Sequence, residues 1–166
     1  RDPKNYKKID GYQDFNEVIN IDQLPIGKTS RSNPILYIGA FDEIRKIFAS
    51  TEEAKRRSYS PGHFSFNTGN GRCPDCMGNG FERIEMQFLS DVFLSCEACH
   101  GKRFREEILE IKYKNKSISN ILEQTVSEAI VFFSAQKKIL KGLSSLSLVG
   151  LGYLKFGQAL TTLSGG

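Results

Sequence analysis

Residues 73–101 have the sequence CPDCMGNGFERIEMQFLSDVFLSCEACHG, in which nineteen residues separate two C-x-x-C pairs. Two thiolates placed two residues apart can hold one Zn²⁺ from a tight turn, and a second pair completes a tetrahedron. The spacing falls within the two-pair zinc pattern. We therefore predict one structural zinc site, whose ligands are Cys73, Cys76, Cys96 and Cys99.

The residues around the cysteines support this prediction. Gly78 and Gly101 each lie two residues after the second cysteine of a pair. Glycine permits a positive φ, so the chain can curl and direct backbone N–H groups at the sulfurs. Residues 81–88 and 91–95 are typical of two strands joined by a turn. We expect a β-hairpin that holds the two cysteine pairs in register.

Other uses of the cysteines fit less well. Disulfides are typical of secreted chains, and no targeting signal is present in this sequence. A catalytic zinc needs an open position, which four thiolates do not leave. A redox role for a C-x-x-C pair requires a strand–motif–helix context that is absent here. His100 could replace a ligand, but four cysteines already suffice, so we expect it to be a bystander.

Most of the remaining sequence is helical in pattern. Residues 39–49 repeat apolar side chains at helical spacing. Thr125 and Glu128 match a capping box, and an amphipathic stripe follows over residues 136–149. We expect an α+β fold, mostly helical, with a four-cysteine zinc module that contains the β-hairpin.

Three further stretches have less regular patterns. Residues 17–22 favour a short strand, and the prolines within residues 23–38 favour a loop. Residues 106–113 alternate between polar and apolar side chains, which favours another strand.

Composition limits the class of protein. The 166 residues are 39% hydrophobic and 25% charged, which indicates a globular domain. The formal net charge of +4 indicates an acidic partner only if the positive charge is clustered. No apolar run approaches the ~20 residues of a membrane span, so we expect no membrane partner and a cytoplasmic location. Because Arg1 is not Met and the sequence stops at TLSGG, we expect a piece of a longer protein or a processed one.

Basic residues gather in two places. Lys55 and Arg57 belong to a cluster over residues 45–57, and Lys102 and Arg103 flank the second cysteine pair. Such clusters are either ordinary solvated surface or a phosphate-contacting face, and the sequence alone leaves both open. Phenylalanines near the cysteines could stack on bases, but core is the better interpretation for most of Phe64, Phe66, Phe88 and Phe93.

The segment Gly27-Lys28-Thr29 looks like the end of a phosphate-binding P-loop. The P-loop pattern requires a glycine where this chain has Asp22, whose Cβ and negative charge are both unfavourable there. Pro34 follows soon afterwards and disfavours the required helix just before it. The sequence therefore does not predict a P-loop or an autonomous nucleotidase.

Several stretches together resemble the UvrA family, whose members are ABC-type ATPases of bacterial nucleotide excision repair. The resemblance covers residues from about 18 to 166 and corresponds to the second half of those proteins. It rests on IDQLPIGKTSRSNP, FDEIRKIFA, GHFSFN, GRCPDCMGNG, CEACHGKRF, VGLGYLKFGQ and TTLSGG.

The resemblance implies roles in handling ATP and Mg²⁺ within an intact protein. Gln23 would lie in the Q-loop and approach the metal and the attacking water. Ser164, Gly165 and Gly166 would belong to the ABC signature motif and contact the γ-phosphate of ATP in the opposite site. The implied division is 1–34, a remnant of the nucleotide-binding domain ending in the Q-loop; 35–157, a signature/insertion domain with the zinc module at about 64–105; and 158–166, the signature motif.

The resemblance also implies that the zinc-bearing insert faces duplex DNA. Lys55, Arg57, Lys102 and Arg103 then become candidates for phosphate contact, and distortion of the duplex would be sensed through deformability. A second UvrA subunit and UvrB would be partners. The implied function is a part of a DNA-damage-sensing ATPase in the excinuclease and SOS response.

An alternative is a zinc-stabilised, chaperone-like module that binds proteins and not DNA. The motif C-x-x-C-x-G-x-G also occurs in DnaJ-type chaperones, which carry four copies. This chain has one full copy, CPDCMGNG, and one partial copy, CEACHGK, which favours the DNA-repair interpretation. Since no Walker A or Walker B motif is present in this sequence, we expect no ATP hydrolysis by this chain alone.

Overall fold

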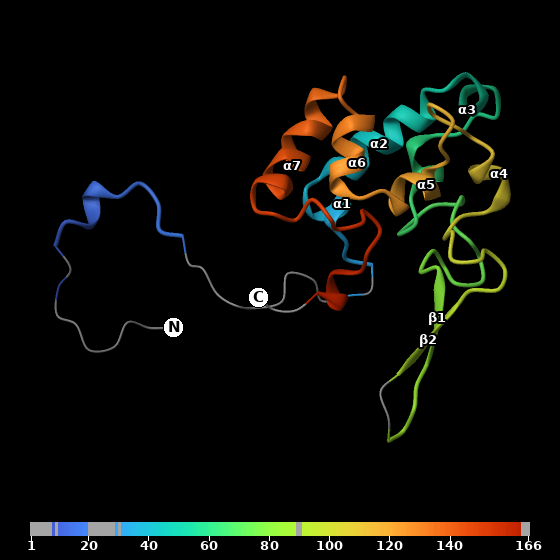
Figure 1. Cartoon of the computed structure of the whole chain (residues 1–166), viewed down its shortest axis with the longest axis horizontal. Coiled ribbons are helices and arrows are strands. Elements are labelled where there is room, and N and C mark those ends of the chain that lie inside the picture. The colour runs from blue at the N-terminus through green and yellow to red at the C-terminus, as the bar shows by residue number, and fades with distance from the viewer. Residues whose placement is uncertain (1–7, 9, 20–28, 30, 89–90, 164–166) are drawn as a thin grey trace.

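The computed structural model describes residues 8, 10–19, 29, 31–88 and 91–163 (Figure 1). Within these residues the fold is α+β, as predicted, with a helical body and one antiparallel β-hairpin. The helices are α1 Pro34–Tyr37, α2 Ala40–Ala49, α3 Glu52–Arg56, α4 Glu106–Leu109, α5 Ile118–Glu123, α6 Val126–Phe132 and α7 Lys137–Leu148. The 3₁₀ helices are η1 Tyr12–Asp14, η2 Pro61–Phe64 and η3 Leu160–Thr162, and the strands are β1 Phe81–Ile84 and β2 Val92–Ser95.

The helical body is built around α2. Its apolar face buries Phe41, Ile44 and Phe48 against η2 and α7. Phe48 packs on Phe64 with ring centroids 5.5 Å apart. The helix predicted over residues 39–49 is therefore confirmed, and its apolar spacing exists because one face meets the core.

The predicted capping box begins α6. The backbone N–H of Glu128 donates to Thr125 Oγ1 at 3.2 Å, and the Thr125 N–H donates to Glu128 Oε2 at 2.8 Å. This reciprocal pair satisfies two N–H groups that have no partner within the helix. The stripe predicted over 136–149 becomes α7, but its last part is exposed: Leu148 is 86% exposed and Val149, which follows the helix, is 68% exposed.

Three local expectations were wrong. Residues 106–109 form α4, because adjacent Ile108 and Leu109 are both buried, and a strand would place them on opposite faces. Residues 34–37 form α1 within the predicted loop, where Asn33 Oδ1 caps Leu36 N–H at 3.1 Å and Pro34 occupies the first turn. Residues 17–19 have no regular structure, and the rest of that predicted strand lies outside the described residues.

The predicted hairpin is confirmed, but its first strand ends at Ile84, so residues 85–88, which were expected to belong to it, lie outside the strand. Its strands pair antiparallel, with Phe81 opposite Ser95 and Ile84 opposite Val92. The hairpin extends away from the helices (Figure 1), and β2 is exposed along its whole length. An isolated bridge between Arg72 and Phe104 closes the base of this region, and we call residues 72–104 the metal module.

None of the helices in the described part of the chain is both long enough and apolar enough to span a membrane.

Candidate metal centre

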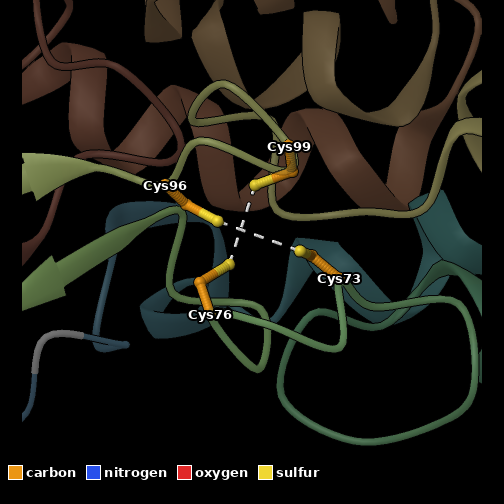
Figure 2. A group of neighbouring side chains, drawn as sticks. All are labelled: Cys73, Cys76, Cys96 and Cys99. Carbon is orange, nitrogen blue, oxygen red and sulfur yellow. Dashed lines mark hydrogen bonds between the residues drawn. The ribbon is translucent and has the colours of Figure 1, made fainter.

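The four predicted cysteines converge on one point (Figure 2). Their sulfur atoms all lie within 4.8 Å of one another, with 4.0 Å between Cys73 and Cys96 and 3.7 Å between Cys76 and Cys99. A tetrahedral ion with Zn–S bonds of about 2.3 Å separates its sulfurs by about 3.8 Å. All four are free thiols, because a disulfide would require about 2.05 Å. The donor set and its geometry therefore fit one tetrahedral zinc ion.

The turns after each cysteine pair hold the sulfurs from the backbone. Gly80 N–H donates to Cys76 Sγ at 3.2 Å. Gly78 has φ +84°, and a Cβ there would lie 1.9 Å from the Phe66 carbonyl oxygen. Only glycine fits at this position, since both the backbone conformation and the close approach exclude a side chain. His100 is exposed and does not belong to the cluster, as expected of a bystander.

The environments of the thiols differ. Burial raises the pKa of Cys99 to about 12, against a lowering by the backbone N–H of Arg103. The backbone N–H groups of Cys99 and Ala98 lower the pKa of Cys96. Four thiolates cannot share one buried position without a positive charge among them, and a divalent ion supplies it.

The candidate basic residues differ in exposure. Lys55 and Lys102 are exposed. Arg57 is half-buried and pairs with Glu53 at 2.5 Å and with Glu110 at 2.6 Å. Both carboxylates raise the pKa of Arg57, and Glu110 has the larger effect.

Arg103 faces the protein. Its Nη2 donates to the Gly157 carbonyl at 2.8 Å, and its guanidinium lies 5.2 Å from the centroid of the Phe66 ring. Burial lowers the pKa of Arg103. Its hydrogen-bonding capacity is therefore partly used within the molecule.

The four phenylalanines that could stack on bases also differ in exposure. Phe64 and Phe66 are completely buried in the helical body, as core side chains. Phe88 is 94% exposed and Phe93 is 57% exposed, both on the hairpin. The nucleotide-site candidates Gln23, Ser164, Gly165 and Gly166 lie outside the described residues.

A further arginine contacts the metal module from outside it. Arg31 Nε donates to Asn79 Oδ1 at 2.9 Å, and its Nη2 donates to the Met77 carbonyl at 3.1 Å. Arg31 therefore reaches into the turn that follows the first cysteine pair. Arg31 and Asn79 are separated by more than forty positions in the sequence, so no local pattern could have indicated their contact.

The fold and the cysteine cluster define a helical domain that carries a four-cysteine metal module. No family model matches the chain. Over 164 residues, which are 99% of the chain, it is 54% identical to UvrABC system protein A of Lactiplantibacillus plantarum and 54% identical to that of Bacillus subtilis. The resemblance to UvrA is thus confirmed along the whole chain, which spans about 17% of the length of these relatives.

A solved structure agrees with this result. UvrA2 from Deinococcus radiodurans matches 87% of the chain, with a TM-score of 0.83 and 49% sequence identity, and 18% of that protein is covered. At this identity and TM-score, the matched 87% of the chain shares the fold of the corresponding part of UvrA2.

Proposed function

We propose that this chain is the zinc-bearing part of a DNA-damage-sensing ABC ATPase of nucleotide excision repair, where it contributes to DNA binding and to its coupling with ATP. The observation that carries the proposal is the similarity to UvrABC system protein A along 99% of the chain. The metal cluster supports it, since the same segment presents the exposed side chain of Lys102 close to the cysteines in sequence.

The proposed ion is a structural Zn²⁺ held by Cys73, Cys76, Cys96 and Cys99. Four thiolates close the coordination sphere, so the ion has no position for a substrate or a water. Its contribution is to fix the two turns and the base of the hairpin. The four cysteines would bind the ion, and the backbone N–H of Gly80 would stabilise the negative charge on Cys76.

The proposed DNA contacts rest on exposure and charge. Lys55 and Lys102 have free access to a phosphate, and Arg57 retains donors beyond its two carboxylate partners. Contacts of this kind carry no base specificity, so they suit a protein that responds to the shape of a damaged duplex. Arg103, which faces Gly157, is a less direct candidate.

The proposed link to ATP follows the division expected from the resemblance. Residues 1–34 would complete a nucleotide-binding domain with Gln23 in the Q-loop, 35–157 would form the signature/insertion domain, and 158–166 would hold the signature motif with Ser164, Gly165 and Gly166. The intact protein would bind ATP and Mg²⁺ in the cytoplasm, dimerise with a second UvrA subunit and interact with UvrB.

The experiment is a salt titration of duplex binding by a full-length protein that carries this segment. Replacing Lys55 and Lys102 together by alanine should reduce the slope of log K against log salt by about 2, since each phosphate contact contributes about 0.9. The control is Lys112→Ala, which removes an exposed lysine outside both basic clusters. Equal affinity and slope in both variants would contradict the DNA contacts and favour the protein-interaction alternative.

A further inference from the structure

Two arginine side chains join the metal module to the helical body. Arg103 belongs to the module and donates outward to the Gly157 carbonyl, at 2.8 Å. Arg31 precedes α1 and donates inward to Met77 and Asn79 of the module. The two contacts run in opposite directions across the same boundary, so the module is held from both sides.

The backbone of Arg103 is bonded to the first cysteine pair and directly follows a residue that is bonded to the second. Its carbonyl accepts a hydrogen bond from Cys73 N–H at 2.9 Å, and the N–H of Lys102, one residue before it, donates to the Cys99 carbonyl at 2.9 Å. Its φ is +70°, which a residue with a side chain adopts only when its surroundings hold it there. A change in the arrangement of the sulfurs would therefore move the Arg103 backbone, and its side chain would move with it.

The segment that contains Arg31 is joined to the segment that Arg103 reaches. Leu160 N–H donates to the Ser32 carbonyl at 2.8 Å, and Ile35 N–H donates to the Phe156 carbonyl at 3.5 Å. Residues 31–35 and 156–160 therefore form one connected unit. We call this unit the junction.

Charge favours the same arrangement. Within the described residues, no carboxylate lies in salt-bridge range of Arg103, and its guanidinium lies over Phe66. A zinc ion with four thiolates has a net charge of −2, which attracts this half-buried cation. Arginine suits the position better than lysine, because its flat guanidinium stacks on a ring while it donates to a carbonyl.

We propose that Arg103, with Arg31 as a second arm, is a positioning residue that couples the metal module to the junction. Displacement of the module or loss of its metal is transmitted to residues 31–35 and 156–160. The coupling itself rests on these contacts. Its consequence for ATP rests on the proposed function, which places Gln23 and residues 164–166 next to the junction along the chain.

Hydrogen exchange tests the coupling directly in a zinc-loaded, full-length protein that carries this segment. Arg103→Met should raise exchange of the amides of residues 157–163 about tenfold, as expected for one lost charge-assisted hydrogen bond, with zinc content unchanged. Arg103→Lys should give a smaller increase. The matched control is Arg105→Met, which removes the same charge from an exposed side chain two residues away and should change nothing there.

Arg31→Met provides a second test if Arg103→Met does not fold. It should raise exchange in residues 77–80, again with zinc retained. If the folded variants exchange at the same rates as Arg105→Met, the coupling is wrong.

The link to ATP has a separate readout, which is the ratio of ATP turnover with and without duplex DNA. Arg103→Met should bring this ratio towards one, whereas Arg105→Met should keep that of the parent. An unchanged ratio in Arg103→Met would contradict the link to ATP. If the parent itself shows no turnover or no effect of DNA, the proposed function fails, and the exchange rates still decide whether the module and the junction are coupled.

Discussion

The helical body and the metal module are stabilised in different ways. The body buries a continuous cluster of large apolar side chains that includes Phe41, Phe48, Phe64 and Phe66. The buried cluster of the module consists of its four cysteines. A two-stranded hairpin alone is marginally stable in water, so we infer that the metal replaces an apolar core in this region.

The two regions also use left-handed backbone conformations differently. In the body, two such residues lie at the ends of elements, Gly39 before α2 and Gly150 after α7, and both have open space around them. In the module they gather in the turns around the sulfurs: Met77, Gly78, Gly80, His100, Gly101 and Arg103. The tight turns of the module therefore surround the sulfurs, whereas those glycines of the body simply end helices or begin them.

Loss of a cysteine should separate the two regions most clearly. Cys96→Ser should abolish zinc binding and raise amide exchange throughout residues 72–104 by at least about a hundredfold, because the ~10–16 kcal/mol of structural zinc binding is also folding free energy. Exchange in α2 and α6 should change much less. His100→Asn, beside Cys99, is the control and should keep its zinc. Simultaneous unfolding of the body would show that the two regions are one unit.

A substitution in the apolar core should instead destabilise the helical body. Phe48→Ala should lower the free energy of unfolding of the body by about 3–5 kcal/mol, because it leaves a cavity among packed rings. Urea denaturation measures this change. Phe88→Ala, on the exposed hairpin, should change it by less than about 0.5 kcal/mol. Similar losses from both substitutions would contradict the division between core and hairpin.

Two glycines with similar φ distinguish conformational strain from close packing. Gly150→Ala should cost about 1–2 kcal/mol through its φ alone, since nothing lies within 4 Å. Gly78→Ala should cost about 2–5 kcal/mol, because its Cβ would also collide with the Phe66 carbonyl. Competition with a chelator should show weaker zinc binding for Gly78→Ala only. Equal zinc affinity in the two variants would show that the turn can move without affecting the ion.

The smallest expected effect concerns the cap of α6. The backbone N–H of Thr125, followed by its hydroxyl, lowers the pKa of Glu128 below its ordinary value of 4.5. A carboxylate with a lowered pKa stabilises the fold above 4.5, and this contribution disappears as the pH falls through the lowered value. Glu128→Gln should therefore be less stable than the parent at pH 7, and the difference should vanish in acid. A difference that is constant with pH would contradict this origin.

The sequence predicted those features that depend on short spacings. The cysteine pairs, the hairpin between them and α2 follow from periods of two to four residues, and Thr125 with Glu128 marked the start of α6. The alternation at 106–113 was misleading, because α4 is only one turn long and its burial depends on distant elements. The contacts of Arg31 and Arg103 join residues about fifty positions apart, so only the three-dimensional structure could show them.

The most direct test is native mass spectrometry of the chain purified with zinc and without reductant. We expect one zinc ion per folded chain and no intramolecular disulfide. The four cysteines should resist alkylation until a chelator is added. A folded chain that carries no metal, or that pairs these cysteines as disulfides, would contradict the claim that an ion organises the module.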